Sequence, residues 1–376
     1  MQRIRAPCCT GVSATAPSAW PPSPSARAGW QPDPSRRHPC RPSHTACPPG
    51  HLPAGRVLPL GWPAEKQSIQ GRTLTDMEKI GFIGLGDMGG PLARNLKASG
   101  ADMIVYDINP KAVAALKAKG AEAASSVAEV AKAADIVITV LPASQHVREV
   151  VLGPGGVLEN AKPGTLVMDM STIDPETTDE LSRKLVEAGL AFVDSPIGRT
   201  VEFAERGESL FMVGASSNDF GRVKPSLEGM GSVIHHCGGP GTGIRTKLVN
   251  NFLAISQNQL SAEAIALATA LGLELEQTLT VVNGTTATNG SLTLGWPNKV
   301  LKGDIEPGFK IDLALKDLSL IMEAAKGKKL PMMMGAAAKE ALTIATTGLG
   351  MGEKDFSGLL HAQCKLGGLT PPKLKG

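Results

Sequence analysis

A glycine-rich turn between a strand and a helix constrains the fold of this chain more than any other feature. Residues 79–84 read as a short strand buried on both faces, and apolar side chains at helical spacing follow through Leu92 and Leu96. The turn between them is Gly84-Leu85-Gly86-Asp87-Met88-Gly89. A GxGxxG spacing alone is weak evidence, but between a strand and a helix it is typical of a dinucleotide-binding fold.

Each glycine of this turn has its own predicted role. Gly84 permits the tight turn, Gly86 lets a pyrophosphate approach the backbone, and Gly89 allows the helix to pack closely on the strand. The phosphates would then meet the positive end of the helix dipole. We expect the whole turn, including Asp87 and Met88, to lie against the cofactor.

An acidic residue follows the next strand at the spacing that ribose recognition requires. The strand at 103–107 ends in Asp107, 23 residues after Gly84. Its carboxylate is placed to accept hydrogen bonds from the adenosine ribose hydroxyls, and it would repel a 2′-phosphate. This predicts a preference for NAD (NADH). The alternative is that Asp107 caps the helix expected at 110–119.

Further strands extend this unit into a doubly wound parallel sheet. The runs 135–140 and 165–170 are apolar and rich in β-branched residues, and each precedes a helical segment; 191–194 and 209–214 complete the sheet. The pattern predicts an α/β fold with a Rossmann-like domain over 77–240. Ligands bind at the carboxyl ends of such strands, where Leu141, Pro142 and Thr172 stand. Alternatively, Pro142 starts a helix and Thr172 lies in a turn.

The second half of the body reads as helix throughout. A glycine cluster at 238–243 marks a join, and apolar residues from Ile244 onward predict one long helix of about 30 residues. This helix would join the first domain to an all-helical domain over 241–376. Near its start, Lys247, Asn250 and Asn251 lie on neighbouring parts of one face. The local pattern alone favours a solvated face.

The first 76 residues differ from the rest in composition. They hold 14 of the 28 prolines and nine basic against three acidic residues, whereas residues 77–376 have 29 basic and 32 acidic residues. The segment has no apolar periodicity, so we expect 1–76 to be a disordered extension. It is either an upstream extension before a working start at Met77 or an organellar transit peptide. Because the excess positive charge lies there, the body shows no footprint for nucleic acid.

The cysteine positions and the hydropathy bear on metal binding, redox environment and membrane insertion. Four of the six cysteines lie in the first 76 residues and form no C-x-x-C pair, so we expect no metal site. The body holds only Cys237 and Cys364, which suits a reduced, cytoplasmic protein. No apolar stretch approaches the length of a membrane span.

From Met77 to its end, the chain resembles the β-hydroxyacid dehydrogenase family, which includes 3-hydroxyisobutyrate dehydrogenase. The lysine motif Lys-x-x-Asn-Asn at 247–251 is that family's catalytic signature, and Lys316-Asp317 is its second lysine motif. The stretches 196–200, 238–245 and 296–301 carry the likeness across the body.

This resemblance implies roles for residues that the local patterns leave open. Lys247 would be the general acid, Asn250 would orient it and contact the substrate, and Asn251 would add a polar contact. Lys316 would reach the cofactor, and Leu141, Pro142 and Thr172 would line the nicotinamide end. On spacing alone, Lys316 is an exposed helix lysine. The resemblance also implies a homodimer or homotetramer formed through the helical domain.

The loop Gly198-Arg199-Thr200 bears on the substrate. The family usually has Ser-Gly-Gly there, and this chain resembles the branch that reduces 3-sulfolactaldehyde. A guanidinium is a rigid fork of donors suited to an oxyanion, so Arg199 would bind a sulfonate. Further substrate contacts are implied for Asn250, Asn251, Phe252, Leu253 and Ala254. A serine is expected at position 254, so Ala254 removes one hydroxyl donor.

Three functions are compatible with these residues. The first is a reversible NADH-dependent reduction of 3-sulfolactaldehyde to 2,3-dihydroxypropane-1-sulfonate, as in sulfoquinovose breakdown. The second keeps the chemistry with a carboxylate substrate, such as succinic semialdehyde, tartronate semialdehyde or 3-hydroxyisobutyrate. The third is a non-catalytic dinucleotide-binding protein, because fold does not determine function.

Overall fold

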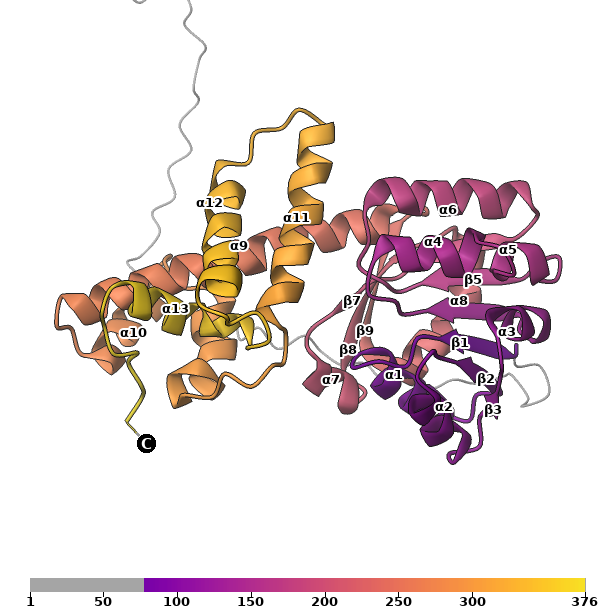
Figure 1. Cartoon of the computed structure of the whole chain (residues 1–376), viewed down its shortest axis with the longest axis horizontal. Helices are drawn as coiled ribbons and strands as arrows, with labels where there is room; N and C mark the ends of the chain where they lie inside the picture. Colours follow the sequence, from indigo (N-terminus) through magenta and orange to yellow (C-terminus); the bar gives the residue numbers. More distant parts are fainter. Residues whose placement is uncertain (1–77, 376) are drawn as a thin grey trace, which may run out of the picture. The chain divides into compact units, whose positions relative to one another are not determined.

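The computed structural model describes residues 78–375 (Figure 1). The prediction of a disordered extension over 1–76, together with its cysteines, lies outside the described residues. The described part consists of a sheet covered by helices, followed by a segment made of helices (Figure 1).

Among residues 78–375, the sheet has nine strands in the order expected of a doubly wound fold. The order is β3-β2-β1-β4-β5-β6-β8-β7, with β9 paired to β8. Six strand pairs are parallel, and the pairs β6–β8 and β7–β8 are antiparallel, so β8 and its parallel neighbour β9 run opposite to the other strands. The order reverses between β1 and β4, and ligands bind at such a switch point. The strands are β1 Ile80–Ile83, β2 Met103–Tyr106, β3 Glu122–Ala123, β4 Ile136–Thr139, β5 Leu166–Asp169, β6 Ala191–Asp194, β7 Ile197–Gly198, β8 Ser209–Gly214 and β9 Gly231–Gly238.

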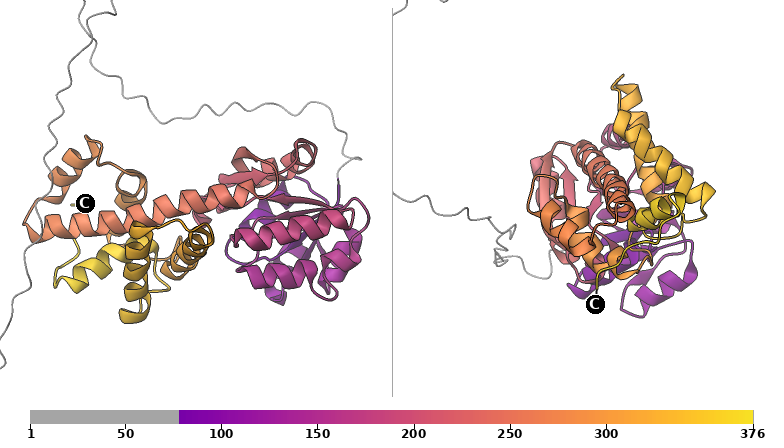
Figure 2. Two further views of the ribbon diagram at one scale, coloured as in Figure 1. Left: turned by 90° about the horizontal axis from the view of Figure 1, so that it is seen from above. Right: turned by 90° about the vertical axis from the view of Figure 1, so that its left-hand side faces the viewer.

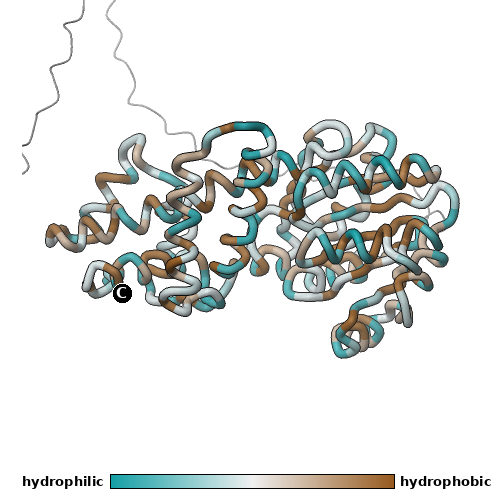
Figure 3. The backbone as a smooth tube through the Cα atoms, turned by 45° about the horizontal axis from the view of Figure 1, so that its top comes forward, coloured by the Kyte–Doolittle hydropathy of each residue, from teal (hydrophilic) through white to brown (hydrophobic). Residues whose placement is uncertain are grey.

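Helices pack on both faces of this sheet because successive strand residues point to opposite sides. In β1, Phe82 belongs to one buried apolar cluster and Ile83 to another. Figure 3 shows strands that are hydrophobic along their length between helices of mixed character. The covering helices are α1 Gly89–Ala98, α2 Pro110–Lys117, α3 Val127–Ala133, α4 Ser144–Leu152, α5 Val157–Asn160, α6 Pro175–Glu187, α7 Val201–Glu205 and α8 Ser217–Met230.

One long helix begins where the sheet ends. Helix α9, Thr242–Ala270, has 29 residues, as the sequence predicts, and Figure 2 shows it as a continuous rod (orange). The helices after it are α10 Leu275–Asn283, α11 Ile311–Gly327, α12 Met333–Thr343 and α13 Leu359–Leu366. They share a separate apolar core around Trp296, whose indole N–H donates to Asn258 Oδ1 at 2.8 Å.

The predicted fold class is therefore confirmed: a Rossmann-like sheet, a long joining helix and a helical domain. The two-residue strands β3 and β7 were not predicted, because so short a strand has no periodicity to detect. The domain limits at 240 and 241 stay a prediction, although the last described strand ends at Gly238 and α9 starts at Thr242.

Candidate active site

The glycine turn has the geometry that its spacing predicts. Gly84 has φ +96°, and a side chain there or at Gly89 would collide with backbone atoms of the turn or of Val140. A Cβ on Gly86 would instead meet open space, with nothing within 4 Å. Helix α1, which begins at Gly89, has no side-chain cap at its N-terminus. The turn thus suits a pyrophosphate.

Asp107 holds the end of β2 against this turn. Its Oδ2 accepts the Leu85 N–H at 2.6 Å, and its Oδ1 accepts the Asn109 N–H at 2.7 Å. The N-cap of α2 is Asn109, whose side chain accepts the Lys111 N–H. The alternative that Asp107 caps this helix is therefore wrong. Its carboxylate is instead fixed beside the glycine turn.

A buried carboxylate joins the ends of β4 and β5. Asp169 Oδ1 accepts the hydroxyls of Thr139 at 2.8 Å and Ser171 at 2.6 Å, and Ser171 Oγ accepts the Leu141 N–H at 2.9 Å. Burial raises the pKa of the Asp169 carboxyl, although these hydroxyls oppose the shift. Sequence reasoning missed Asp169; an acid at the end of an otherwise apolar strand was the available signal.

Lys316 on α11 binds the same two loops. Its Nζ donates to the carbonyl oxygens of Thr172 at 2.7 Å and Pro142 at 3.3 Å, and lies 3.1 Å from Asp317 Oδ1. The alternative of a free, exposed lysine is therefore wrong. Pro142 does not start α4, which begins at Ser144 after an Ala143 cap. The structure brings Pro142, Thr172 and Lys316 together, as the resemblance implies.

Lys247 is buried near the start of α9. Its side chain donates from Nζ to the Ile197 carbonyl oxygen at 2.7 Å. Burial lowers the pKa of its ammonium below the ordinary 10.5; Asp317 opposes this shift and Lys316 adds to it. The solvated-face alternative is wrong for this residue. A buried lysine with a lowered pKa is suited to donating a proton.

The two asparagines form a chain of hydrogen bonds to α11. Asn250 Nδ2 donates to Asn251 Oδ1 at 3.1 Å, and Asn251 Nδ2 donates to Asp317 Oδ2 at 2.7 Å. Asn251 and Asp317 are buried, whereas Asn250 is exposed. Asp317, which sequence reasoning left without a role, therefore joins the asparagines to Lys316. The hydrogen-bond partner of Lys247 Nζ is Ile197, not Asn250.

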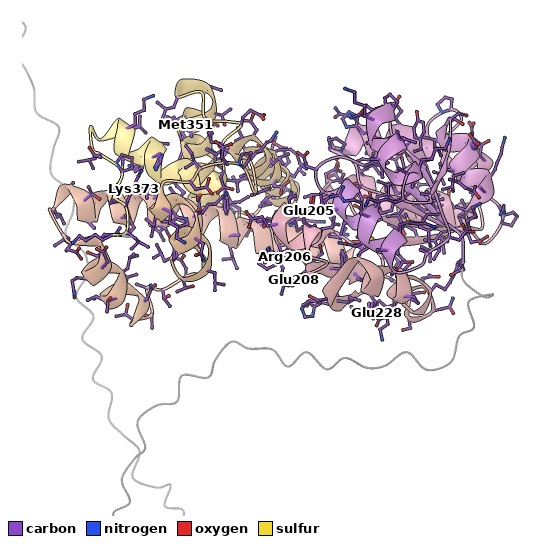
Figure 4. The ribbon with its side chains drawn as sticks, turned by 90° about the horizontal axis from the view of Figure 1, so that it is seen from below. Glu205, Arg206, Glu208, Glu228, Met351 and Lys373 are labelled. Atoms are coloured by element: carbon purple, nitrogen blue, oxygen red, sulfur yellow. The ribbon has the colours of Figure 1, made fainter. Side chains whose placement is uncertain are left out.

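Arg199 has an unusual backbone conformation. Its φ is +70°, in the left-handed region that favours glycine. Its Nη1 donates to the Glu208 carbonyl oxygen at 2.5 Å, and its guanidinium lies 5.1 Å from the centroid of the Phe203 ring. Arg206 and Glu208, which are labelled in Figure 4, form an ion pair at 3.0 Å. A non-glycine residue held in this region points to a functional constraint.

The other predicted substrate residues lie around this loop and along α9. Gly198 is buried, and a Cβ added there would lie only 3.0 Å from the Leu210 side chain. Thr200 is the N-cap of α7. Phe252 packs on the helical core, whereas Leu253 and Ala254 are exposed. Because these three positions lie inside a long helix, their N–H groups bond within the helix. Only their side chains are available to a ligand.

Residues 78–375 contain neither a candidate metal site nor a candidate membrane span. No group of three or more His, Cys, Asp or Glu side chains there could hold a metal ion. Within the same residues, no helix combines the length and apolarity needed to cross a membrane.

Comparison with known families covers both parts of the described chain. Residues 79–239 match the NAD-binding domain of 6-phosphogluconate dehydrogenase. Residues 241–362 match the family described as NAD-binding of NADP-dependent 3-hydroxyisobutyrate dehydrogenase.

The alignments with individual relatives cover nearly the whole length of each relative. The chain is 43% identical to 3-sulfolactaldehyde reductase of Escherichia coli over 294 residues, 78% of this chain and 98% of that protein. It is 35% identical to the mitochondrial 3-hydroxyisobutyrate dehydrogenase of Mus musculus, covering 82% of this chain and 92% of that protein. The solved Mycobacterium tuberculosis 3-hydroxyisobutyrate dehydrogenase with L-serine is 32% identical, covers 76% of this chain and 98% of its own, and has a TM-score of 0.70.

Proposed function

This chain belongs to the β-hydroxyacid dehydrogenase family, and we propose that it reduces 3-sulfolactaldehyde with NADH to 2,3-dihydroxypropane-1-sulfonate in a reversible reaction. That it is a nicotinamide-dependent oxidoreductase acting on a CH–OH group follows from its relatives. The observation that carries the finer proposal is Arg199, which takes a glycine-like conformation two residues after the carbonyl that binds Lys247.

The residues described above fit a dinucleotide. The open space at Gly86, the uncapped start of α1 and the carboxylate of Asp107 would hold its pyrophosphate and ribose. Pro142, Thr172 and Lys316 would lie at its nicotinamide end, with Leu141, Asp87 and Met88 lining the rest. When bound, the cofactor supplies the hydride that adds to the aldehyde carbon.

Lys247 would supply the proton for this reduction. Negative charge develops on the aldehyde oxygen as its carbon is reduced, and a nearby ammonium stabilises that charge and donates the proton. One of the three Nζ donors of Lys247 is bound to the Ile197 carbonyl, which leaves two for a substrate. Asn250, exposed beside it, would contact the substrate hydroxyl.

The pKa of Lys247 leads to a pH prediction. Reduction needs the protonated amine, so kcat/KM for reduction should be level in the pH range just below the Lys247 pKa and fall above it. Because burial lowers that pKa, the midpoint should lie below 10.5. The oxidation direction needs the neutral amine, so its kcat/KM should rise with pH. Initial rates in both directions across pH 6–11 would measure this. A midpoint for reduction at or above 10.5, or an oxidation rate that does not rise with pH, would contradict it.

Asp107 would favour NADH over NADPH by repelling a 2′-phosphate. In Asp107→Ser, we expect the NADPH-to-NADH ratio of kcat/KM to rise by on the order of tenfold, about 1.4 kcal/mol. The ratio corrects for any general loss caused by freeing the Leu85 N–H. Asp102→Ser, an exposed acid before the same strand, is the matched control and should leave the ratio unchanged. An unchanged ratio in Asp107→Ser would remove this residue from cofactor selection.

Arg199 would anchor the sulfonate. Among residues 78–375, one of its five N–H donors is hydrogen-bonded, to the Glu208 carbonyl oxygen. Asn250 to Ala254 on α9 would contribute side-chain contacts. Ala254 offers no hydroxyl where a serine is expected, and one hydrogen bond to a charged group is worth about 1.5–3 kcal/mol.

A carboxylate semialdehyde is the second candidate substrate, because a guanidinium also binds carboxylates and relatives include 3-hydroxyisobutyrate dehydrogenases. The deciding experiment compares kcat/KM of the full chain with 3-sulfolactaldehyde and with succinic semialdehyde. A preference for the sulfonate of about a hundredfold, or 2.7 kcal/mol, supports the proposal. Equal rates or a carboxylate preference would refute the sulfonate assignment and leave the dehydrogenase chemistry intact.

We further propose a cytoplasmic homodimer or homotetramer formed through the helical domain. Four large apolar side chains along α9 are at least half exposed: Val249, Leu253, Leu260 and Leu267. Their spacings of four, seven and seven residues place them along one side of the helix. Such a face supports burial against a second copy.

A further inference from the structure

Asp194, at the end of β6, holds the first turn of α9 through both of its carboxylate oxygens. Oδ1 accepts the Gly241 N–H at 2.5 Å, and Oδ2 accepts the Ile244 N–H at 2.6 Å. Its side chain is 2% exposed. Helix α9 has no side-chain cap of its own, because its N-cap is Gly241 with φ +86°. A carboxylate from another element thus takes the place of a cap at the positive end of the helix.

The space around this carboxylate is made by two glycines. A Cβ on Gly243 would lie 2.9 Å from Asp194 Oδ2, and a Cβ on Gly214 would collide with Oδ1. Both glycines have negative φ, so backbone conformation does not require glycine at either position. Room for the Asp194 carboxylate requires glycine at 214, whereas at 243 the atom closest to such a Cβ is the Met212 carbonyl oxygen of β8.

Residues 194–197 position both the backbone and the side-chain amine of Lys247. Its backbone lies three residues after Ile244, less than one turn from the residue that Asp194 binds. Its Nζ binds the carbonyl of Ile197, three residues after Asp194. Residues 194–197 therefore fix both the rotation of the helix that carries Lys247 and the position of its ammonium.

We infer that Asp194 is a positioning residue for Lys247: by capping α9, it sets the register and rotation at which the ammonium meets the substrate. This rests on the proposed role of Lys247 as the general acid. Asp194 itself touches neither the glycine turn nor the loops at Pro142 and Thr172 by any hydrogen bond among the described residues. Loss of its carboxylate should therefore reduce turnover without weakening cofactor binding.

The ionisation of Asp194 provides a second, independent signal. Burial raises the pKa of its carboxyl to about 6, although the hydrogen bonds from the Ile244 and Gly241 N–H groups oppose this shift. The charged groups facing it are Asp169 on β5 and Arg245 on α9, and Arg245 pairs with Asp179 of α6 at 2.8 Å. A protonated Asp194 places a hydroxyl where α9 presents an N–H. Turnover should therefore fall below about pH 6, where Lys247 remains protonated.

The test compares Asp194→Asn with Asp179→Asn. The amide keeps one acceptor oxygen and places an NH₂ against the second N–H, so kcat should fall by on the order of 100-fold, the cost of a shift of about 1 Å. The Kd for NADH, measured by fluorescence, should stay within a few-fold of wild type. Asp179 also reaches the first turn of α9, through Arg245, but at the surface; its variant should keep wild-type kcat.

The pH profile separates positioning from simple stabilisation. Wild type and Asp179→Asn should show an acid limb in kcat near pH 6, and Asp194→Asn should lack it. If Asp194→Asn does not fold, a wild-type acid limb with unchanged NADH affinity still supports the inference, and its absence refutes it. An Asp194→Asn enzyme that melts earlier but keeps wild-type kcat and acid limb would also overturn it. Full activity in Lys247→Ala would instead overturn the proposed function beneath it.

Discussion

Replacing Lys247 by alanine should reduce kcat for aldehyde reduction by on the order of a thousandfold. General acid catalysis contributes about 10²–10⁴-fold, and a charge placed at the developing oxyanion about 10²–10³-fold. One ammonium supplies both effects here, so they are lost together and do not multiply fully. The loss should appear in kcat, because the interaction strengthens only as charge develops on oxygen. Single-turnover NADH oxidation with saturating aldehyde measures it.

Two further variants identify which property of Lys247 matters. Lys247→Arg places a guanidinium there, which keeps its proton throughout the working pH range. This variant should therefore restore part of the electrostatic effect, and its kcat should not fall at high pH. Lys326→Ala removes a lysine that is 78% exposed at the end of α11 and should behave as wild type. A Lys247→Ala enzyme within about tenfold of wild type would assign proton transfer to another group. A non-catalytic dinucleotide-binding protein would show no turnover even before substitution.

Removal of Lys247 should not prevent folding. The side chain is a buried ammonium whose burial disfavours its charged form, and its Nζ satisfies one carbonyl, that of Ile197. Truncation leaves a small cavity and one unpaired carbonyl, together worth a few kcal/mol at most. Loss of the desolvated charge offsets part of that cost. Thermal unfolding followed by circular dichroism should therefore show a cooperative transition in Lys247→Ala.

Structural features that depend on residues close together in the sequence could be predicted from the sequence. The roles of Gly84 and Gly89 follow from a turn of six residues, and the structure confirms their close backbone approaches. The cap of α2 shows the limit of such reasoning. Asp107 and Asn109 are both good caps, and Asn109 takes this role while Asp107 binds the Leu85 N–H, 22 residues earlier in the chain.

Features that depend on partners far away in the sequence could not be predicted from the sequence. Asp194 looks like the polar end of a strand, and its partners in α9 lie 47 and 50 residues further on. Asp317 meets Asn251 across 66 residues. The hydrogen-bond partner of Lys247 belongs to β7, a strand of two residues with no pattern to detect. The resemblance implied functional roles for Lys247 and Lys316, but did not indicate the groups that hold them.

The left-handed conformation of Arg199 was equally unpredictable from the sequence, because arginine rarely adopts a positive φ and does not signal one in advance. Keeping arginine there costs about 1–2 kcal/mol of backbone strain. The hydrogen bond to Glu208 and the contact with Phe203 return part of it, about 0.5–1 kcal/mol for an exposed cation–π pair. The stability of Arg199→Gly should therefore be close to that of wild type. Stability alone gives no reason to keep arginine at this position.

Arg199→Gly should consequently change selectivity without unfolding the protein. We expect kcat/KM for 3-sulfolactaldehyde to fall about a hundredfold or more, near 2.7 kcal/mol, because a charged, multidentate contact to the sulfonate is lost. The value for succinic semialdehyde should fall much less, since the family commonly accommodates a carboxylate with glycine in this loop.

The matched control for this variant is Arg206→Ala. Arg206 also packs on the Phe203 ring, at 4.6 Å, but follows α7 with an ordinary φ of −88° and pairs with Glu208. Its loss changes the local charge equally and should leave the ratio of the two substrates unchanged. Equal losses for both substrates in Arg199→Gly would make the guanidinium a general anion anchor. No loss for either would remove it from the site and return the substrate question to the α9 face around Ala254.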